Sequence, residues 1–536
     1  MSSNVEYISE VYILSVPLES DYKHTLYFKD SIEQENYFKS RIVRRFNDFN
    51  YIRKDSTIKV GATDANGLNS DCDSLLNAGV NYVMYKNKKY NGKTFYAFIK
   101  ELRYENDNLT SIEIETDVLQ TWFFNYHLKE SFVEREHVAD DTIGLHTQPE
   151  GLETGEYICN DEDTLDFGDM YIVMATTQLG STEFIGGVYN GAYSGVRYVA
   201  CKVTNYSGIN TMLKQLTDDY GAGDAVTSIF MCPKFLLGEI ADGKDVSSGS
   251  FQAKADEFIM KKHYAMLGDY TPHNNKLYTF PFNYLLASNN CGGNAIYKYE
   301  DFDTRDTLNE NDIIFKYYGA LCPGGSIKIV PEKYKGTIGN NIEESLNAGK
   351  FAICNWNTDV YTNWLTQNSV NMSLSYASAG LQIVSGVALM GTGAGALAGA
   401  GSVANGALAI AQTMGQKYQQ SLVPRQAEGN LNAGDVINAM GENNIKFYCM
   451  SIKGEYAEII DKYFDAYGYQ VNKIKIPNKN HRAKYWYTKT IDVNIDGKIP
   501  NNDMQKIKDC YNNGLTFWKN AEEIQNYSLG RENVIV

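Results

Sequence analysis

The sequence predicts a mainly β protein with minor α content, interrupted once by a long apolar insertion that is rich in glycine and alanine. The chain holds 40 tyrosines and 23 phenylalanines, which favour half-buried pleated surfaces over helices. Short alternating segments are separated by clusters of polar turn residues, as is typical of successive strands. The composition shifts sharply only near Val360, where the apolar insertion begins.

The composition of the 536 residues narrows the class of protein. A hydrophobic content of 43% is enough for several domains with real cores. The net charge of -16 argues against affinity for nucleic-acid phosphates or anionic lipid, because both need clustered lysine or arginine. The nine cysteines form no C-x-x-C pair, so we expect neither a disulfide framework nor a zinc site, and assembly in a reducing cytoplasm fits best. The acidic start of the chain does not resemble a secretion signal.

Strand signals dominate the N-terminal part. Residues Val11–Val16 alternate between two faces, and Tyr82–Phe98 contain an Asn-Gly pair between β-rich flanks, which predicts a tight hairpin. The segment SIEIETDVLQTWFF, Ser111–Phe124, continues the alternation and is predicted as a strand, with a turn at Glu105–Asn108 before it.

Helical signals are few. They predict helices at Ser207–Thr217, Asn341–Ala348 and Asp503–Asn512, the last with an asparagine cap before Asp503. No fixed period recurs along the chain, which argues against a solenoid or a propeller.

The apolar insertion is too long for a single membrane-spanning helix. Between Asp359 and Lys417 about 57 residues carry no formal charge, whereas one bilayer-spanning helix needs about 20. Two antiparallel passes joined near Gly391–Gly401 suit a hydrocarbon layer of about 30 Å. A helical hairpin is therefore the predicted shape in a membrane.

Small residues four apart predict that copies of this hairpin associate, because such spacing lets helices approach closely in lipid. The large apolar side chains are sparse, so one copy would insert only marginally and several would be needed. The residues predicted to act on a membrane are Leu381, Ile383, Val384, Val387, Leu389, Met390, Gly391, Gly395, Leu397, Gly399, Val403, Leu408 and Ile410.

Two other interpretations of the insertion were weighed. A glycine- and alanine-rich loop that fills an internal space is as compatible with the residues as a membrane hairpin, and both stay open. Gly391–Ala396 also matches G-x-G-x-x-A, but no acidic residue for a ribose follows until Glu428, which argues against dinucleotide binding.

No catalytic, cofactor or metal site is predicted. The nearest catalytic candidate is Arg135-Glu136-His137 with Asp140-Asp141, and a structural salt-bridged turn or a subunit contact explains it better.

The acidic run Asp161–Asp163, with Asp166 and Asp169, lacks the spacing of a calcium loop and is predicted to be a solvated loop. The isolated His263 and His273 indicate no site.

Three blocks of the sequence resemble a known family. They are DVLQTWFF continued by Ser131–Ile158, then LYTFPFNYLLASNNCGGNAIYKYEDF at Leu277–Phe302, and Gly468–Asn520. In this order they are similar to the tail knob proteins of small short-tailed phages of Gram-positive bacteria, over essentially the whole chain.

The resemblance implies a virion protein that assembles in the bacterial cytoplasm and sits at the distal end of a short tail. It implies β-barrel-type tube domains in a homohexameric ring, contacts with other tail proteins, and passage of phage DNA without specific binding. In that family a long apolar loop plugs the lumen and later breaches the host cell membrane, and here that loop corresponds to about Asn371–Gln420. The division expected on this basis is 1–150, N-terminal tube domain; 151–359, central β-rich part; 360–430, apolar loop; and 431–536, C-terminal tube domain.

Elementary energetics agree with a removable plug. Small side chains are cheap to withdraw, whereas each buried leucine would add about 1.5 to 3 kcal/mol of resistance. A tail adhesin and a cell-wall-degrading tail component remain the alternatives.

Overall fold

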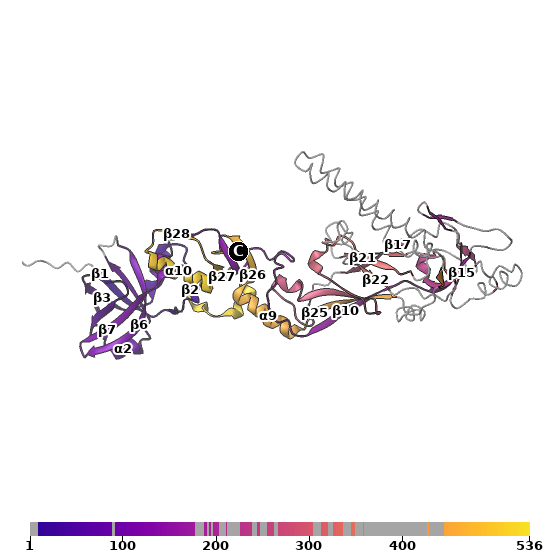
Figure 1. The fold of residues 1–536 in the computed structure, drawn as a ribbon. Coiled ribbons are helices and arrows are strands. Elements are labelled where there is room, and N and C mark those ends of the chain that lie inside the picture. The colour runs from indigo at the N-terminus through magenta and orange to yellow at the C-terminus, as the bar shows by residue number, and fades with distance from the viewer. Residues whose placement is uncertain are drawn as a thin grey trace, which may run out of the picture. The chain divides into compact units, whose positions relative to one another are not determined.

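The computed structural model describes two compact units, and most of its described residues are in strands. The described residues are 9–87, 92–176, 226–237, 254–261, 266–303, 312–319, 325–335 and 444–536, with short pieces at 187–189, 192–194, 197–202, 211, 244–246, 345–348, 357–358 and 426–427. Unit 1 comprises Met1–Glu153, Pro272–Leu277 and Glu455–Val536, and unit 2 comprises Thr154–Thr271 and Tyr278–Gly454. The prediction of a mainly β fold with minor α content is confirmed (Figure 1).

Unit 1 begins with a six-stranded antiparallel sheet in the order β3-β1-β5-β6-β7-β4. The strands are β1 (Ser9–Leu14), β3 (Ile42–Phe49), β4 (Thr57–Gly61), β5 (Tyr82–Asn87), β6 (Thr94–Asn106) and β7 (Leu109–Thr116). The predicted hairpin is confirmed, because β5 pairs with β6 from Tyr82 opposite Phe98 to Lys86 opposite Thr94. The predicted turn before β7 is confirmed as well.

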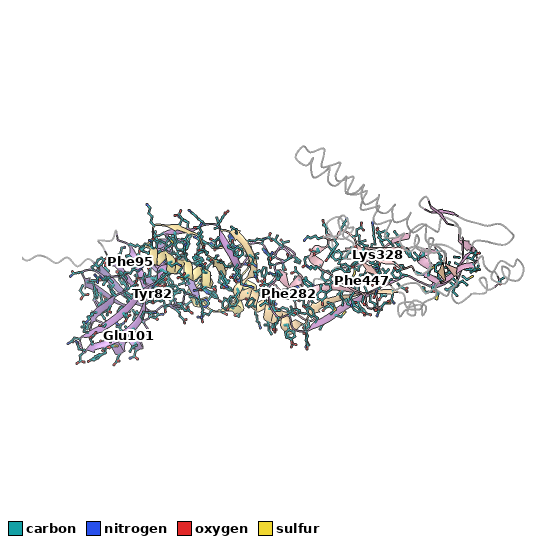
Figure 2. All side chains as sticks on the ribbon, in the orientation of Figure 1. Tyr82, Phe95, Glu101, Phe282, Lys328 and Phe447 are labelled. Atoms are coloured by element: carbon teal, nitrogen blue, oxygen red, sulfur yellow. The ribbon has the colours of Figure 1, made fainter. Side chains whose placement is uncertain are left out.

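Both faces of this sheet are covered at its central strands β1 and β5, whereas β4 and the second half of β6 leave side chains exposed. Along β1, Val11 and Ile13 belong to one core cluster, and Tyr12 and Leu14 belong to another. The alternation predicted for this strand is confirmed, but both of its faces are buried. Tyr82 and Phe95 show the same arrangement on the neighbouring strands, since they lie in different clusters (Figure 2).

The second sheet of unit 1 joins the two ends of the chain. Its order is β2-β29-β27-β9-β26, and only the β2–β29 pair is parallel. The strands are β2 (His24–Leu26), β9 (Ser131–Glu136), β26 (Tyr469–Lys475), β27 (Tyr485–Ile491) and β29 (Leu515–Trp518), and a further pair joins β8 (Tyr126–Leu128) to β28 (Ile495–Gly497). N-terminal and C-terminal segments therefore share one core in unit 1 (Figure 1).

Five α-helices of the described residues were only partly foreseen. They are α1 (Ser31–Ser40), α2 (Cys72–Asn77), α3 (Val118–Trp122), α9 (Gly454–Tyr467) and α10 (Asn501–Asn513). The sequence reasoning missed α1, although Asp30 caps it and Glu33 accepts from the Lys29 amide at its start. It also missed α9, although Ala457, Ile460 and Phe464 are buried at helical spacing.

The strand predicted across Ser111–Phe124 is wrong in its second half. The strand β7 ends at Thr116, and Asp117 then accepts a hydrogen bond from the Gln120 amide and caps α3. The first amides of a helix have no partner within the helix, and an aspartate before the helix accepts hydrogen bonds from them. All five residues of α3 are buried, so tertiary packing overrides the alternating pattern.

The three predicted helices have different outcomes. The helix at Asp503–Asn512 is confirmed as α10, but its cap is Pro500 rather than an asparagine, because the Pro500 carbonyl accepts from the Asp503 and Met504 amides. The helix predicted at Asn341–Ala348 is wrong over its described end, where β22 pairs with β21. The helix predicted at Ser207–Thr217 lies outside the described residues except for Thr211.

Unit 2 contains three four-stranded sheets, in the orders β10-β25-β18-β19, β15-β11-β14-β16 and β17-β20-β21-β22. The strands are β10 (Tyr157–Asp166), β11 (Met170–Thr176), β14 (Arg197–Lys202), β15 (Val226–Pro233), β16 (Lys244–Val246), β17 (Lys254–Lys261), β18 (Asn283–Ser288), β19 (Asn294–Tyr297), β20 (Asp312–Gly319), β21 (Lys328–Pro331), β22 (Leu346–Asn347) and β25 (Asn444–Ile452). Two short pairs are β12 (Gly187–Tyr189) with β13 (Ala192–Ser194), and β23 (Asn357–Thr358) with β24 (Gln426–Ala427). A single core cluster that includes Phe315 and Phe447 links these sheets (Figure 2).

The acidic run of unit 2 is a strand and not the solvated loop that we expected. Asp161, Glu162 and Asp163 lie in β10, which pairs with β25, and all three side chains are exposed. Asp169, just after this strand, forms an ion pair with Lys202 at 2.6 Å.

One glycine of unit 1 sits where another residue would not fit. Gly468 separates α9 from β26, has a φ of +64°, and bonds through its amide to the Phe464 carbonyl at 2.8 Å. A Cβ atom at this position would overlap the backbone carbonyl of Glu136 on β9. The close approach of helix end and strand therefore depends on the missing side chain.

Replacing Gly468 with alanine should lower the free energy of unfolding by about 3 kcal/mol, because the cost of the positive φ adds to the cost of the backbone overlap. Gly67→Ala is the matched control: Gly67 has a φ of +78° but open space around it, so we expect a loss of only about 1 kcal/mol. Urea unfolding followed through the buried Trp486 and Trp518 measures both variants. Equal losses would show that the overlap contributes nothing.

Candidate functional site

The predicted membrane-active residues, from Leu381 to Ile410, lie outside the described residues. What the structure describes is the base of that segment. Thr358 of β23 pairs with Gln426 of β24, and Asn357 pairs with Ala427. This antiparallel ladder places the chain before the apolar segment next to the chain after it.

Arg135 and Glu136 of the charged triplet that the sequence singled out are the last two residues of β9 in unit 1, and His137 follows directly after this strand. Arg135 donates from Nη1 to the Gly468 carbonyl at 2.7 Å and forms an ion pair with Glu150. Glu136 forms an ion pair with Lys475 and accepts from the Asn478 amide at 3.2 Å. Arg135 and Glu136 thus hold neighbouring segments in place, as the structural interpretation of the triplet predicts.

His137 is fixed as a neutral ring. Its Nδ1 accepts from the Tyr487 amide at 2.6 Å, so the proton is on Nε2, which lies 2.9 Å from the Asp465 carbonyl. Burial, together with the charge of Arg482, lowers the pKa of His137 to about 3. A ring that stays neutral and has both nitrogens engaged is not suited to proton transfer near neutral pH.

The crossing segment, Pro272–Leu277, is bound to unit 1 by buried polar contacts. The Asn274 amide group donates to Asp461 and Asp465, each at 2.8 Å. Asn275 donates to the Asp141 carbonyl at 2.6 Å.

Lys276 of the same segment forms an ion pair with Glu150, and both side chains are almost fully buried. Glu150 therefore binds two cations, Lys276 and Arg135, one from the crossing segment and one from β9.

His273 lies at the start of the crossing segment, between two carboxylates of α9. Its Nδ1 is 2.8 Å from Asp461, and its Nε2 contacts Asp465. Burial alone would lower the pKa of His273, but the two carboxylates raise it to about 9. The sequence reasoning assigned His273 no role. The only signal was the i,i+4 spacing of Asp461 and Asp465, which places both on one helix face. His263 lies outside the described residues.

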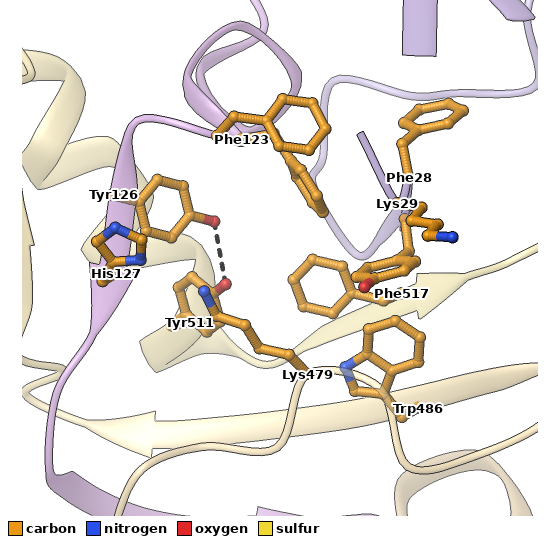
Figure 3. Close-up of a pocket in the computed structure, with 11 residues that line it drawn as sticks. Phe28, Lys29, Phe123, Tyr126, His127, Lys479, Trp486, Tyr511 and Phe517 are labelled. Atoms are coloured by element: carbon orange, nitrogen blue, oxygen red, sulfur yellow. Dashed lines mark hydrogen bonds between the residues drawn. The ribbon is translucent and has the colours of Figure 1, made fainter. Parts of the chain in front are cut away.

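Unit 1 also contains an aromatic pocket with a volume of about 220 Å³ (Figure 3). Its lining residues come from three separate parts of the chain, and none of these described residues is acidic. They are Tyr27, Phe28, Lys29, Phe123, Phe124, Tyr126, His127, Lys479, Trp486, Tyr511 and Phe517. No sequence motif pointed to this pocket, because its members meet only in the fold.

Among the described residues, no group of three or more His, Cys, Asp or Glu side chains could hold a metal ion. Within the same residues, no helix has the length and apolar character that crossing a membrane requires.

Comparisons with known proteins agree with the sequence blocks. A family model described as "Bacillus phage phi29, Tail knob protein gp9, C-terminal domain" matches residues 247–532, and another, "Caudoviral major tail protein N-terminus", matches residues 8–127. The chain is 26% identical to the tail knob protein gp9 of Bacillus phage PZA and 26% identical to that of Bacillus phage phi29, with 97% of this chain and 98% of each relative covered. The solved structure of the bacteriophage C1 tail knob protein gp12 has the same fold, with a TM-score of 0.60 at 13% identity over 99% of this chain and 100% of that chain.

Replacing His273 with glutamine should remove stability in a pH-dependent way. Because its folded pKa is raised to about 9 from an ordinary value near 6.5, the stabilisation is complete below about pH 6.5 and is lost as the pH rises through about 9. We expect His273→Gln to cost about 2 kcal/mol at about pH 6 and clearly less at about pH 10. Urea unfolding at both pH values measures this.

His127→Gln is the control, because His127 is exposed and has no carboxylate pair around it among the described contacts. A His273→Gln loss of equal size at both pH values would contradict the assignment of a charged ring.

Proposed function

This chain belongs to the phi29 tail knob protein gp9 family, and from that premise we propose that it forms the distal tube of a short phage tail and carries a membrane-active apolar segment. The family match covers more than half of the chain and makes it a phage tail protein. The observation that most directly supports the membrane role is the β23–β24 ladder, which gives the apolar segment adjacent ends.

A segment that leaves and re-enters the fold at one place suits a hairpin. Two antiparallel helices need their outer ends side by side, and Thr358 and Gln426 satisfy this. The paired flanks would keep such a hairpin tethered to the tube after release. Because the segment is rich in glycine and alanine, it would be held only weakly while it fills the lumen.

Ring formation is supported by the edges of the first sheet. The outer strands β3 and β4 have a strand partner on one side only in the described sheet. A closed ring of identical subunits uses heterologous contacts, so one edge of each copy can face the opposite edge of the next. The number six is what the family resemblance implies.

The charge distribution supports passage of DNA. Each copy has a net charge of -16, and Asp161, Glu162 and Asp163 present three exposed carboxylates on β10. If a surface that bears such carboxylates lines the channel, the duplex meets a surface that does not bind its phosphates.

The rival function of a cell-wall-degrading enzyme finds little support at its proposed residues. Glu136 is engaged by Lys475 and by the Asn478 amide, and His137 is held neutral. The names of the relatives describe tail knob proteins and no enzyme. The other rival, a receptor-binding adhesin, has the aromatic pocket in its favour.

Replacing Leu381–Ala411 with a Gly/Ser linker of equal length should abolish dye leakage from liposomes and leave assembly intact. The linker keeps both flanks of the ladder in place, so ring images in negative stain and a mass near six times 60.2 kDa should be unchanged. Leakage equal to that of the full chain would remove the role of the segment.

Replacing Glu136 with glutamine should lower the free energy of unfolding by about 2 kcal/mol, because Lys475 loses its partner. The replacement should not change the release of soluble fragments from cell walls. Glu134→Gln on the same strand is the control, since the more exposed Glu134–Lys489 pair is worth under about 1 kcal/mol. Urea unfolding measures stability. Release of soluble fragments from cell walls by the wild type, lost in Glu136→Gln, would support the enzymatic rival instead.

A further inference from the structure

The aromatic pocket of unit 1 has rigid walls of packed rings. Trp486 and Phe517 stack with centroids 5.2 Å apart, and Tyr27 meets Trp486 edge-on at 5.0 Å. Phe123 contacts Phe517 at 6.4 Å and Phe124 at 5.0 Å, and Phe124 is the most exposed of these rings. Such walls bind the flat apolar face of a ring-shaped group without having to reorganise.

The pocket contains hydrogen-bond donors from both its tyrosines and its lysines. Tyr126 and Tyr511 share one hydrogen bond at 3.0 Å, which leaves one of their two hydroxyl hydrogens uncommitted. Lys479 contributes an ammonium group 5.3 Å from the centre of the Tyr126 ring. The pocket therefore offers a tyrosine hydroxyl hydrogen and the Lys479 ammonium group as donors, and a matching occupant supplies acceptors for them.

The two ammonium groups of the pocket lie on opposite sides of it (Figure 3). Burial lowers the pKa of Lys479, and no carboxylate of the described residues compensates it. A half-buried ammonium group without a counter-ion is costly, and a bound anion would remove that cost. The pocket is lined by lysines and by no acidic residue, although the chain as a whole carries 65 acidic and 49 basic residues.

The size of the pocket restricts the occupant. A volume of about 220 Å³ is below the roughly 300–1,000 Å³ of typical small-molecule sites, and suits one ring with one charged substituent. A sugar ring has an apolar face for the aromatic wall and hydroxyl oxygens for the spare donors. An aromatic side chain beside a carboxylate would satisfy the wall and the ammonium group, but would leave the spare Tyr hydroxyl donor unpaired.

We propose that this pocket binds a phosphorylated sugar unit, with the sugar ring against the aromatic wall and the phosphate at Lys479. The site is separate from the apolar segment, because all its residues belong to unit 1 and none comes from the residues between Thr358 and Gln426.

Calorimetric titration of the full chain with glucose 1-phosphate tests the proposal. We expect glucose 1-phosphate to bind at least about tenfold more tightly than glucose or inorganic phosphate, because only it uses both the wall and the ammonium group. Equal affinity for inorganic phosphate alone would reduce the site to a simple anion site and overturn the proposal. Preferential, Lys479-dependent binding of the dipeptide Glu-Phe would overturn it in favour of an acidic peptide partner.

Variants of the pocket separate the contribution of the Lys479 charge to binding from that of the aromatic wall. Lys479→Met should weaken glucose 1-phosphate binding about tenfold or more, and Lys479→Arg should retain most of it. Phe124→Ala should weaken glucose and glucose 1-phosphate by the same factor. Lys234→Met, at an exposed lysine of unit 2, is the control and should bind as the wild type does.

Unchanged binding by Lys479→Met would overturn the proposal. Circular dichroism checks that each variant is folded, and Lys479→Gln replaces Lys479→Met if the latter does not fold. The variant that lacks Leu381–Ala411 should bind as tightly as the full chain, so failure of the membrane role and failure of this site give different results.

Discussion

The buried carboxylate of Glu150 is the contact on which the arrangement of unit 1 depends. It binds Arg135 of β9 and Lys276 of the crossing segment, and it accepts from the Gln470 amide of β26 at 2.9 Å. Removing either cation would leave a buried charge without its full compensation, which is far costlier than losing a surface pair. The acid therefore fixes three segments that are distant in sequence. In the sequence, the residues of unit 2 lie between these segments. The chain therefore enters and leaves unit 1 at positions that these contacts define.

Local elements were predictable wherever local chemistry decides them. The β5–β6 hairpin and α10 follow from their own residues, and the capping pattern around Asp30 would have identified α1. The failure at α3 has a physical cause: an aspartate cap and complete burial favour a helix over a strand in a sequence that alternates. The pairing of β9 with β26 and β27 joins residues more than 300 positions apart, and no pattern within either segment indicates it. The family resemblance is confirmed by the comparisons, and it came from long blocks rather than from periodicity.

Among the candidate sites, too, those made of contiguous residues were predictable and those assembled from distant residues were not. The apolar segment was conspicuous from composition, and its thirteen predicted residues remain a prediction, supported by the adjacent ends that β23 and β24 provide. By contrast, the charge of His273 depends on Asp461 and Asp465, which reach it only through the fold. The aromatic pocket likewise needs Tyr27, Phe123 and Lys479 to meet from three segments. Sequence reasoning finds sites that are contiguous and misses sites that are assembled.

An acidic tube and a cationic pocket are compatible because their charges act over different distances. At physiological salt, interactions between exposed charges are largely screened beyond about 8 Å, so Lys479 attracts an anion only when the anion enters the pocket. A DNA duplex in the proposed tube would be too wide to bring a phosphate into a space of about 220 Å³, and it would meet exposed carboxylates of the surface instead. A single sugar phosphate can enter and use the donors and rings together. Size, and not net charge, would therefore let one protein fill both proposed roles, because a polyanion stays free to pass while a small anion is bound.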